Sequence, residues 1–537
     1  MSGIAQQALQ SYRRLLVGWF RLQEKLLDYF NLSRRLSLLI LLLGAIQAYL
    51  LARTIMDESW LLLGLLVIGF LVLPVLALRP EWIVVSVAFL VASLISPVFW
   101  DTLALAERGV TLPNILVLYG LLILLFRLAS GQPVNSELWK TPTTVAITVF
   151  LILTVITGFL YHVIVMELPY RKELAELEHM ILWLTYYLVL GLCVDERRLR
   201  HVQIGILLVA ALGAVPTILQ AIFGPERLFF LKLTQRDIRI VPTEGLTRVI
   251  PLGENLITVT FLISWQMMIA SRGAKRLGWG LLGTLYGFAL LMTLTRHVWF
   301  GVLFALAILW LLSDTRTKVI TAIAAALLSS VIASVVLLAR PAGGYTRDDF
   351  FSRISRRFLS TFAEDPQQHS FTRHSSVGQR VYEMRTIMQH WAQSPWLGYG
   401  WSTRLPLKIA WEPYRGKTVN PVTYVHNSFW WILGKGGIVG AAGLLLLCIT
   451  GIIRGYQLYR RAVDPFARAW LLALWGGFFA IIVAAQFEPV FWVRNRLIAV
   501  ALTLAFAECV YYFSQKREPV PTPSTEPAGY LRNTARR

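Results

Sequence analysis

Residues 202–223 read VQIGILLVAALGAVPTILQAIF, a run without a single charged side chain. An α-helix needs about 20 consecutive apolar residues to cross the ~30 Å hydrocarbon layer of a bilayer. The run is preceded by Arg197, Arg198 and Arg200, and basic residues beside an apolar segment are typical of its cytoplasmic end. The stretch therefore predicts a membrane-spanning helix that starts on the inner side.

The same pattern recurs along the whole chain of 537 residues, of which 56% are hydrophobic and 15% are charged. This composition excludes soluble dehydrogenases, kinases and DNA-binding proteins, because so much apolar surface could not be covered in water. We expect an all-α polytopic membrane protein with about 12–14 transmembrane helices. Hydropathy places the candidate spans at residues 36–52, 60–78, 82–100, 112–126, 142–165, 179–194, 202–223, 251–270, 277–295, 297–313, 319–339, 426–453, 469–487 and 495–514.

The net charge of +21 has to be interpreted by position along the membrane topology. Short loops rich in Lys and Arg fall on one side if both termini are cytoplasmic. We expect residues 1–35 to form an amphipathic segment on the inner membrane surface. Residues 36–339 and 426–514 carry the spans, and residues 515–537 form a proline-rich cytoplasmic tail that is disordered. No nucleic-acid partner is expected, since the membrane accounts for the basic residues.

Two outer segments are basic although the positive-inside rule does not call for it. These are residues 224–250 and the large periplasmic loop 340–425, which holds twelve Lys and Arg against six Asp and Glu. Guanidinium groups near a bilayer suit a phosphate group, because they offer a planar fork of donors that stays ionised. Contact with anionic lipid headgroups is the alternative, and composition alone does not separate the two.

His426 is the first candidate for chemistry. It lies at the predicted boundary between the large loop and the span that follows. An imidazole there can take a proton from a sugar hydroxyl near neutral pH, since its ordinary pKa is ~6.5. The alternative is an interfacial histidine that only caps the helix.

Three arginines are candidates for binding an anion. Arg296 stands between two apolar runs that leave almost no loop, where an arginine must pair, reach the interface or face an aqueous cavity. Arg380 interrupts the apolar stripe of a helix expected over 376–393, and its partner is either Glu383 one turn later or a ligand phosphate. Arg248 precedes the point where the chain re-enters the membrane, and taken alone it fits an interfacial anchor.

Other chemistries find little support in the sequence. There is no DxD, HExxH or GxSxG motif, so metal-bound diphosphate chemistry and serine hydrolysis are not indicated. The spans carry no ladder of Asp and Glu for coupling ions to transport. Lys435, about nine residues into its span, is the one feature that favours a transporter or flippase for an anionic solute.

Taken in chain order, the motifs resemble the O-antigen ligase and O-antigen polymerase superfamily, bacterial inner-membrane glycosyltransferases that use lipid-linked glycans. The resemblance rests on four local patterns between about residues 240 and 445. They are Arg248 through Asn255, Thr295 through Trp299, Gly378-Gln379-Arg380 followed by Pro395 through Gly400, and His426-Asn427 followed by Gly437 and Gly440.

The resemblance implies a GT-C-like fold, with a large helical periplasmic loop before the helix that carries His426. It implies metal-independent, cofactor-free transfer of a glycan from undecaprenyl pyrophosphate at the periplasmic face. Arg296, Arg380 and Arg248 would bind the pyrophosphate and His426 would serve the acceptor, supported by Asn427 and Tyr424. The acceptor is a glycan or a lipid-anchored core. We favour an O-antigen ligase acting on lipid A core, with a polymerase or a protein O-oligosaccharyltransferase as alternatives.

Overall fold

The computed structural model describes residues 75–92, 111–132, 134–223, 238–241, 246–293, 295–313, 317–323, 376–405 and 425–516, with residues 17, 21, 73, 315, 325–326 and 330. The expected spans 36–52 and 319–339 therefore lie wholly or mostly outside the described residues, as does most of span 60–78.

The described chain is helical almost throughout. Its first half contains α4 (Glu81–Ala92), α6 (Leu112–Ala129), η2 (Ser136–Lys140), α7 (Pro142–Leu151), the π-helix η3 (Ile152–Thr157), α8 (Gly158–Ile164), α9 (Tyr170–Leu177), η4 (Glu178–Leu184), α10 (Thr185–Leu192) and α11 (Glu196–Phe223). Its second half contains α12 (Glu254–Ala270), α13 (Gly273–Met292), α14 (Arg296–Leu312), α17 (Ser376–Trp391), α18 (Ser428–Arg461), α19 (Pro465–Ala485) and α20 (Arg494–Lys516).

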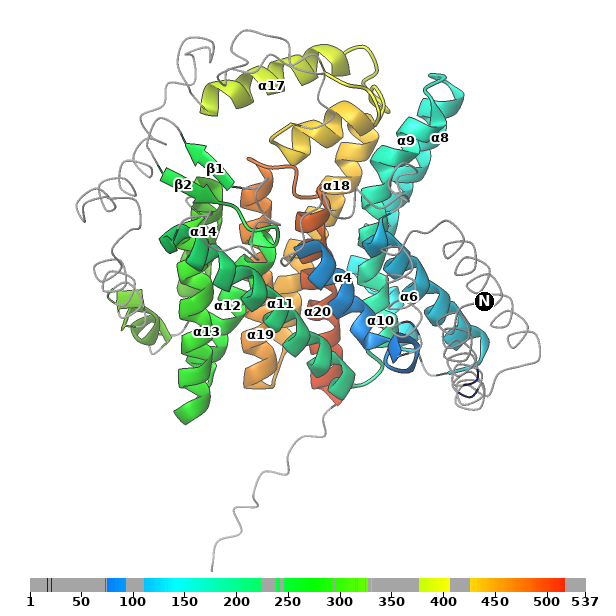
Figure 1. The fold of residues 1–537 in the computed structure, drawn as a ribbon. Coiled ribbons are helices and arrows are strands. Elements are labelled where there is room, and N and C mark those ends of the chain that lie inside the picture. Colours follow the sequence, from blue (N-terminus) through cyan, green and yellow to red (C-terminus); the bar gives the residue numbers. More distant parts are fainter. Residues whose placement is uncertain are drawn as a thin grey trace, which may run out of the picture.

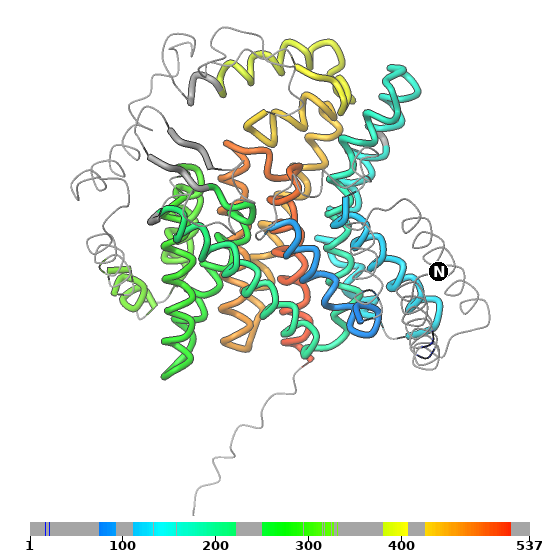
Figure 2. Tube along the Cα trace, viewed as in Figure 1, coloured from blue at the N-terminus to red at the C-terminus, as the bar shows by residue number. Residues whose placement is uncertain are grey.

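The helices form a bundle around the C-terminal pair (Figures 1 and 2). α19 packs against α12, α14, α18 and α20, and α20 packs in turn against α4 and α10. α20 is apolar around most of its circumference and buried along most of its length, as expected for a helix at the centre of a bundle. The last spans in the sequence thus form the centre on which the earlier ones assemble.

Six helical segments of the described residues are long and apolar enough to cross a membrane. They are Leu112–Ala129, Pro142–Ile164, Glu196–Ala221, Ser428–Arg461, Pro465–Ala485 and Arg494–Lys516. The predicted class, an all-α polytopic membrane protein, is confirmed. One feature was not predicted: β1 (Ile238–Val241) and β2 (Leu246–Val249) form a small antiparallel hairpin within the basic segment 224–250.

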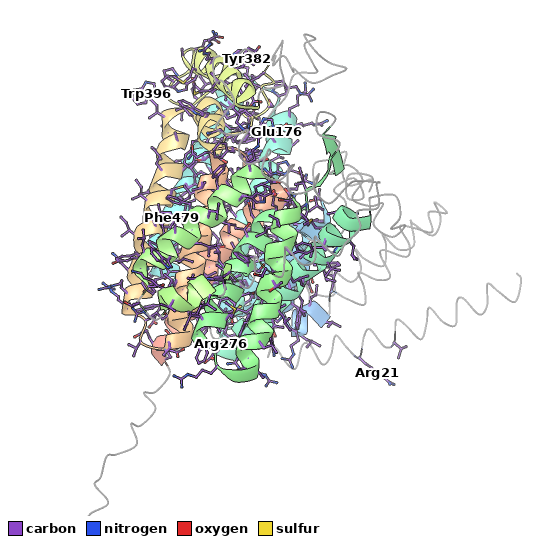
Figure 3. The ribbon with its side chains drawn as sticks, turned by 90° about the vertical axis from the view of Figure 1, so that its left-hand side faces the viewer. Arg21, Glu176, Arg276, Tyr382, Trp396 and Phe479 are labelled. Carbon is purple, nitrogen blue, oxygen red and sulfur yellow. The ribbon has the colours of Figure 1, made fainter. Side chains whose placement is uncertain are left out.

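α17 lies across one end of the bundle instead of joining it (Figure 1). Its observed bounds agree closely with the helix expected over 376–393. Tyr382 of this helix and Trp396 lie at the opposite end of the bundle from Arg276, which belongs to a basic loop expected on the inner side (Figure 3). The arrangement agrees with α17 lying on the outer side, and that sidedness stays a prediction.

Candidate functional site

The candidate site is organised by the loop that joins α19 to α20, residues 486–493, called here the α19–α20 loop. α19 ends at Ala485 and α20 begins at Arg494, so the loop lies at the ends of the two central helices, where α17 contacts it. Gln486, Phe487 and Glu488 of this loop make the contacts that bring distant parts of the sequence together.

Asn427 starts α18 and fixes it to the loop. Its side-chain oxygen accepts hydrogen bonds from the backbone N–H of Phe429 at 2.9 Å and of Trp430 at 3.0 Å. This caps two N–H groups that the first turn of a helix leaves unpaired. Its Nδ2 donates to the backbone oxygen of Gln486 at 2.8 Å. Asn427 therefore determines where α18 begins, and with it the position of the preceding His426.

His426 is bound to Glu383 of α17. One carboxylate oxygen of Glu383 accepts from the backbone N–H of His426 at 3.0 Å, and the other lies 2.9 Å from its Nδ1. Glu383 is buried, whereas the His426 side chain is 36% exposed. The sequence had offered Glu383 only as a partner for Arg380, so its contact with His426 was missed.

Arg380 and the start of α14 meet at Phe487. The Arg380 guanidinium lies over the Phe487 ring, 5.7 Å from its centroid. The imidazole of His297 stacks on the same ring, with centroids 6.3 Å apart and an interplanar angle of 20°. Arg296 directly precedes His297 and is partly buried at the first position of α14. The structure thus brings Arg380 and His297, the residue next to Arg296, to one aromatic side chain.

Glu488 gives the loop a negative charge between Arg496 and His297. Its carboxylate pairs with Arg496 of α20 and lies 3.6 Å from Nε2 of His297. Its backbone oxygen accepts from the hydroxyl of Ser428 at 2.8 Å, which ties the loop again to the first turn of α18. These contacts hold α14, α18 and α20 in one register around the site.

α18 is broken near its outer end, and the break is filled by the segment before it. Gly437 has φ 64° and ψ −165°, a conformation essentially restricted to glycine. Residues of the Pro395–Gly400 motif pair with the backbone groups that the break exposes. The bonds are Tyr399 N–H to Gly434 O at 3.0 Å, Ile438 N–H to Pro395 O at 2.9 Å, and Val439 N–H to Trp396 O at 3.1 Å.

Lys435 belongs to this junction. Its amine is fully buried and donates to the backbone oxygens of Trp401, at 2.7 Å, and Thr403. On the neighbouring α9, Glu173 accepts from Trp401 N at 3.0 Å and from the hydroxyl of Ser402 at 2.6 Å. Burial alone would raise the pKa of Glu173, but contacts from His162 and Ser402 outweigh it and lower the pKa. Lys435 therefore holds the loop segment 395–405 against α18.

Two predicted residues are not placed at the site. Arg248 lies in β2, where its register partner is Arg239 of β1, and its role in binding an anion stays a prediction. Tyr424 lies outside the described residues. Arg385, expected to be solvated on the opposite face of its helix from Arg380, is exposed.

The groups collected at the site are guanidinium, imidazole and carboxylate side chains. Across the described part of the chain, no three His, Cys, Asp or Glu side chains are grouped as a metal site requires. Guanidinium groups can bind and stabilise an anion, and an imidazole held by a carboxylate can accept a proton. The combination suits the transfer of a group away from a phosphorylated leaving group.

Comparison with known families covers this part of the chain. Residues 281–445 match the family model described as O-antigen ligase. The matched region runs from α13 into α18 and includes Arg296, Arg380, Glu383 and His426. A search of curated proteins found no match. Together with the membrane helices, the match supports the resemblance of this region to O-antigen ligases and an O-antigen-ligase-like function in general.

Proposed function

We propose that the protein transfers a glycan from undecaprenyl pyrophosphate to a hydroxyl group of lipid A core, at the periplasmic face of a bacterial inner membrane. The observation that carries the proposal is the meeting of α14, α17 and α18 at the α19–α20 loop. It places two arginine-bearing helix ends and the histidine at the same end of the bundle.

Arg296 and Arg380 would bind the pyrophosphate and stabilise the charge that develops as it leaves. Such stabilisation contributes several kcal/mol in a poorly hydrated site. The ring of Phe487 supports this role, because the Arg380 guanidinium packs over it. Arg248 would assist from the hairpin side. A clamped pyrophosphate is a good leaving group, so the proposed reaction requires no metal and no cofactor.

His426 would take the proton of the acceptor hydroxyl as that oxygen attacks the sugar. General-base catalysis of this kind typically contributes about 10²–10⁴ in rate. The exposure of the His426 side chain supports access by an acceptor. Asn427 would position His426 through its cap on α18, and Tyr424 would support the same side of the site.

The test is complementation of a bacterial strain that lacks its own O-antigen ligase. His426→Ala, Arg296→Ala and Arg380→Ala are each expected to abolish attachment of glycan to lipid A core at equal expression. Arg385→Ala, which changes an exposed arginine of the same helix, is the matched control and should retain transfer. If all three site variants still attach glycan, the residue assignment is wrong.

The pattern of glycans distinguishes the members of the superfamily. Loss of a ligase leaves free chains of normal length, whereas loss of a polymerase leaves core capped with a single repeat. Glycan attached to protein would instead indicate an O-oligosaccharyltransferase. The ligase is favoured because the matched family carries that description. The structural role of Lys435 removes the feature that favoured a transporter.

A further inference from the structure

The contact between Glu383 and His426 is more specific than a surface ion pair. Glu383 is 5% exposed, and both of its oxygens are engaged by the same residue, one by the backbone and one by the ring. Two bonds from one carboxylate fix both the position of the His426 backbone and the rotation of its imidazole.

This contact also decides which ring nitrogen carries the proton. A carboxylate accepts hydrogen bonds, so Nδ1 of His426 carries the proton in the contact with Glu383. In the neutral ring the lone pair is then on Nε2. A histidine without such a partner would divide its population between the two tautomers and several ring orientations.

We propose that Glu383 is a positioning residue for His426, holding the ring so that Nε2 takes the acceptor's proton and stabilising the imidazolium that results. This inference rests on the proposed function. In the step, the acceptor oxygen forms a bond to the anomeric carbon while its proton passes to Nε2. The bond from that carbon to the pyrophosphate oxygen breaks, and its electron pair leaves with the pyrophosphate. The imidazolium afterwards returns its proton to water.

Other charged and titratable groups lie around the same site. Arg380 lies one turn before Glu383 on α17, Arg296 and His297 start α14, and Glu488 lies in the α19–α20 loop. All of them remain when Glu383 alone is replaced, so a change in kcat can be attributed to Glu383.

The experiment measures transfer by the purified full-length chain in detergent, with undecaprenyl-pyrophosphate-linked oligosaccharide as donor and lipid A core as acceptor. Glu383→Gln keeps the size of the side chain but removes its charge. We expect kcat to fall about 100-fold or more. KM for the donor should change little, because the lost contact acts on the step served by His426 and not on binding of the pyrophosphate.

Two further variants keep the result interpretable. Glu383→Asp retains the carboxylate, so it should recover part of the kcat that Glu383→Gln loses. Arg385→Gln, on the exposed face of α17, should leave both kcat and KM unchanged. If Glu383→Gln folds and keeps wild-type kcat, or if the Asp variant loses as much kcat as the Gln variant, the positioning role is overturned.

The outcomes also separate this inference from the function on which it rests. If His426→Ala is inactive while Glu383→Gln shows wild-type kcat, only the role of Glu383 fails. If His426→Ala keeps full activity, the proposed base fails and the role of Glu383 fails with it. If the wild-type protein transfers nothing from this donor, the proposed substrate class is wrong.

Discussion

Replacing Gly437 with alanine should uncouple the outer part of α18 from the loop segment that fills its break. A Cβ atom at this position would overlap the backbone carbonyl of Trp396, closer than real Cβ atoms approach. Its φ of 64° would be strained for alanine even in open space. The structure cannot accept this Cβ atom without a change in the backbone. Either the backbone of Gly437 moves, or the Pro395–Tyr399 turn is displaced.

The size of the effect follows from these two losses. Backbone strain in this region costs about 1–3 kcal/mol for a residue other than glycine. Displacing the turn breaks the three backbone hydrogen bonds that join it to α18, each with a net contribution of about 0.5–1.5 kcal/mol. The sum is about 3–7 kcal/mol, which is a large part of the stability of an ordinary domain, about 5–15 kcal/mol.

The assay is thermal unfolding of the detergent-purified protein, with glycan transfer measured in parallel. Gly440→Ala is the matched control, because its Cβ would meet the Ile432 side chain at an acceptable 3.4 Å and its φ is not positive. We expect Gly437→Ala to lower the apparent melting temperature strongly and to abolish transfer, while Gly440→Ala remains close to wild type. Equal melting temperatures for the two variants would refute the reasoning.

Three further predictions concern other parts of the molecule. Phe487→Leu removes the ring beneath Arg380, and the loss of about 0.5–2 kcal/mol of cation–π attraction should raise KM for the donor roughly 2- to 30-fold; an unchanged KM would count against the role of the ring. Arg454→Gln leaves the buried Glu508 without its bidentate partner, so the free energy of unfolding should fall by about 3–5 kcal/mol; an unaltered melting temperature would contradict this. The pKa of Glu173 is lowered from its ordinary value of 4.5, so the ionised carboxylate stabilises the fold above that pH and the stabilisation is lost as the pH falls below it; wild type should therefore lose more stability than Glu173→Gln between about pH 5 and about pH 3, and equal losses would show that Glu173 does not contribute.

Much of the helical framework was predictable from the sequence, because a helix that crosses the bilayer needs an apolar run long enough to span the hydrocarbon layer. The run at 202–223 corresponds to α11, and the helix expected over 376–393 is α17. Helix ends were displaced where polar residues continue a helix beyond the hydrocarbon, as at Arg454 through Arg461 of α18. Hydropathy cannot detect such extensions, because they depend on capping and packing and not on transfer into lipid.

The sequence singled out candidate residues but not the contacts that hold them. Arg296, Arg380 and His426 stand out because charged or titratable residues beside apolar runs are costly unless they pair, reach the interface or face an aqueous cavity. Periodicity shows that Arg380 shares a face with apolar residues, yet it does not show which residue of another segment lies opposite. Glu383 was therefore considered only as a partner for Arg380 on the same helix, and the contact of its carboxylate with His426, 43 positions later, was missed.

The junction at Gly437 was missed for a different reason. Gly436 and Gly440 fit a pattern that lets two helices approach closely, and a positive φ at the glycine between them leaves no mark in a pattern of residue types. Lys435 was likewise read as a charge within the membrane that could bind an anionic solute. Its partners are backbone oxygens, which are equally present at every residue and so carry no sequence signal.

The broken helix has a consequence for how the protein is made. Backbone groups left unpaired inside a membrane helix cost several kcal/mol each, so α18 on its own is a poor substrate for insertion. The Pro395–Tyr399 turn that satisfies those groups lies some forty positions earlier in the chain and leaves the ribosome first. The turn is therefore already synthesised when α18 emerges, and we expect insertion of α18 to be coupled to folding of the Pro395–Tyr399 turn against it.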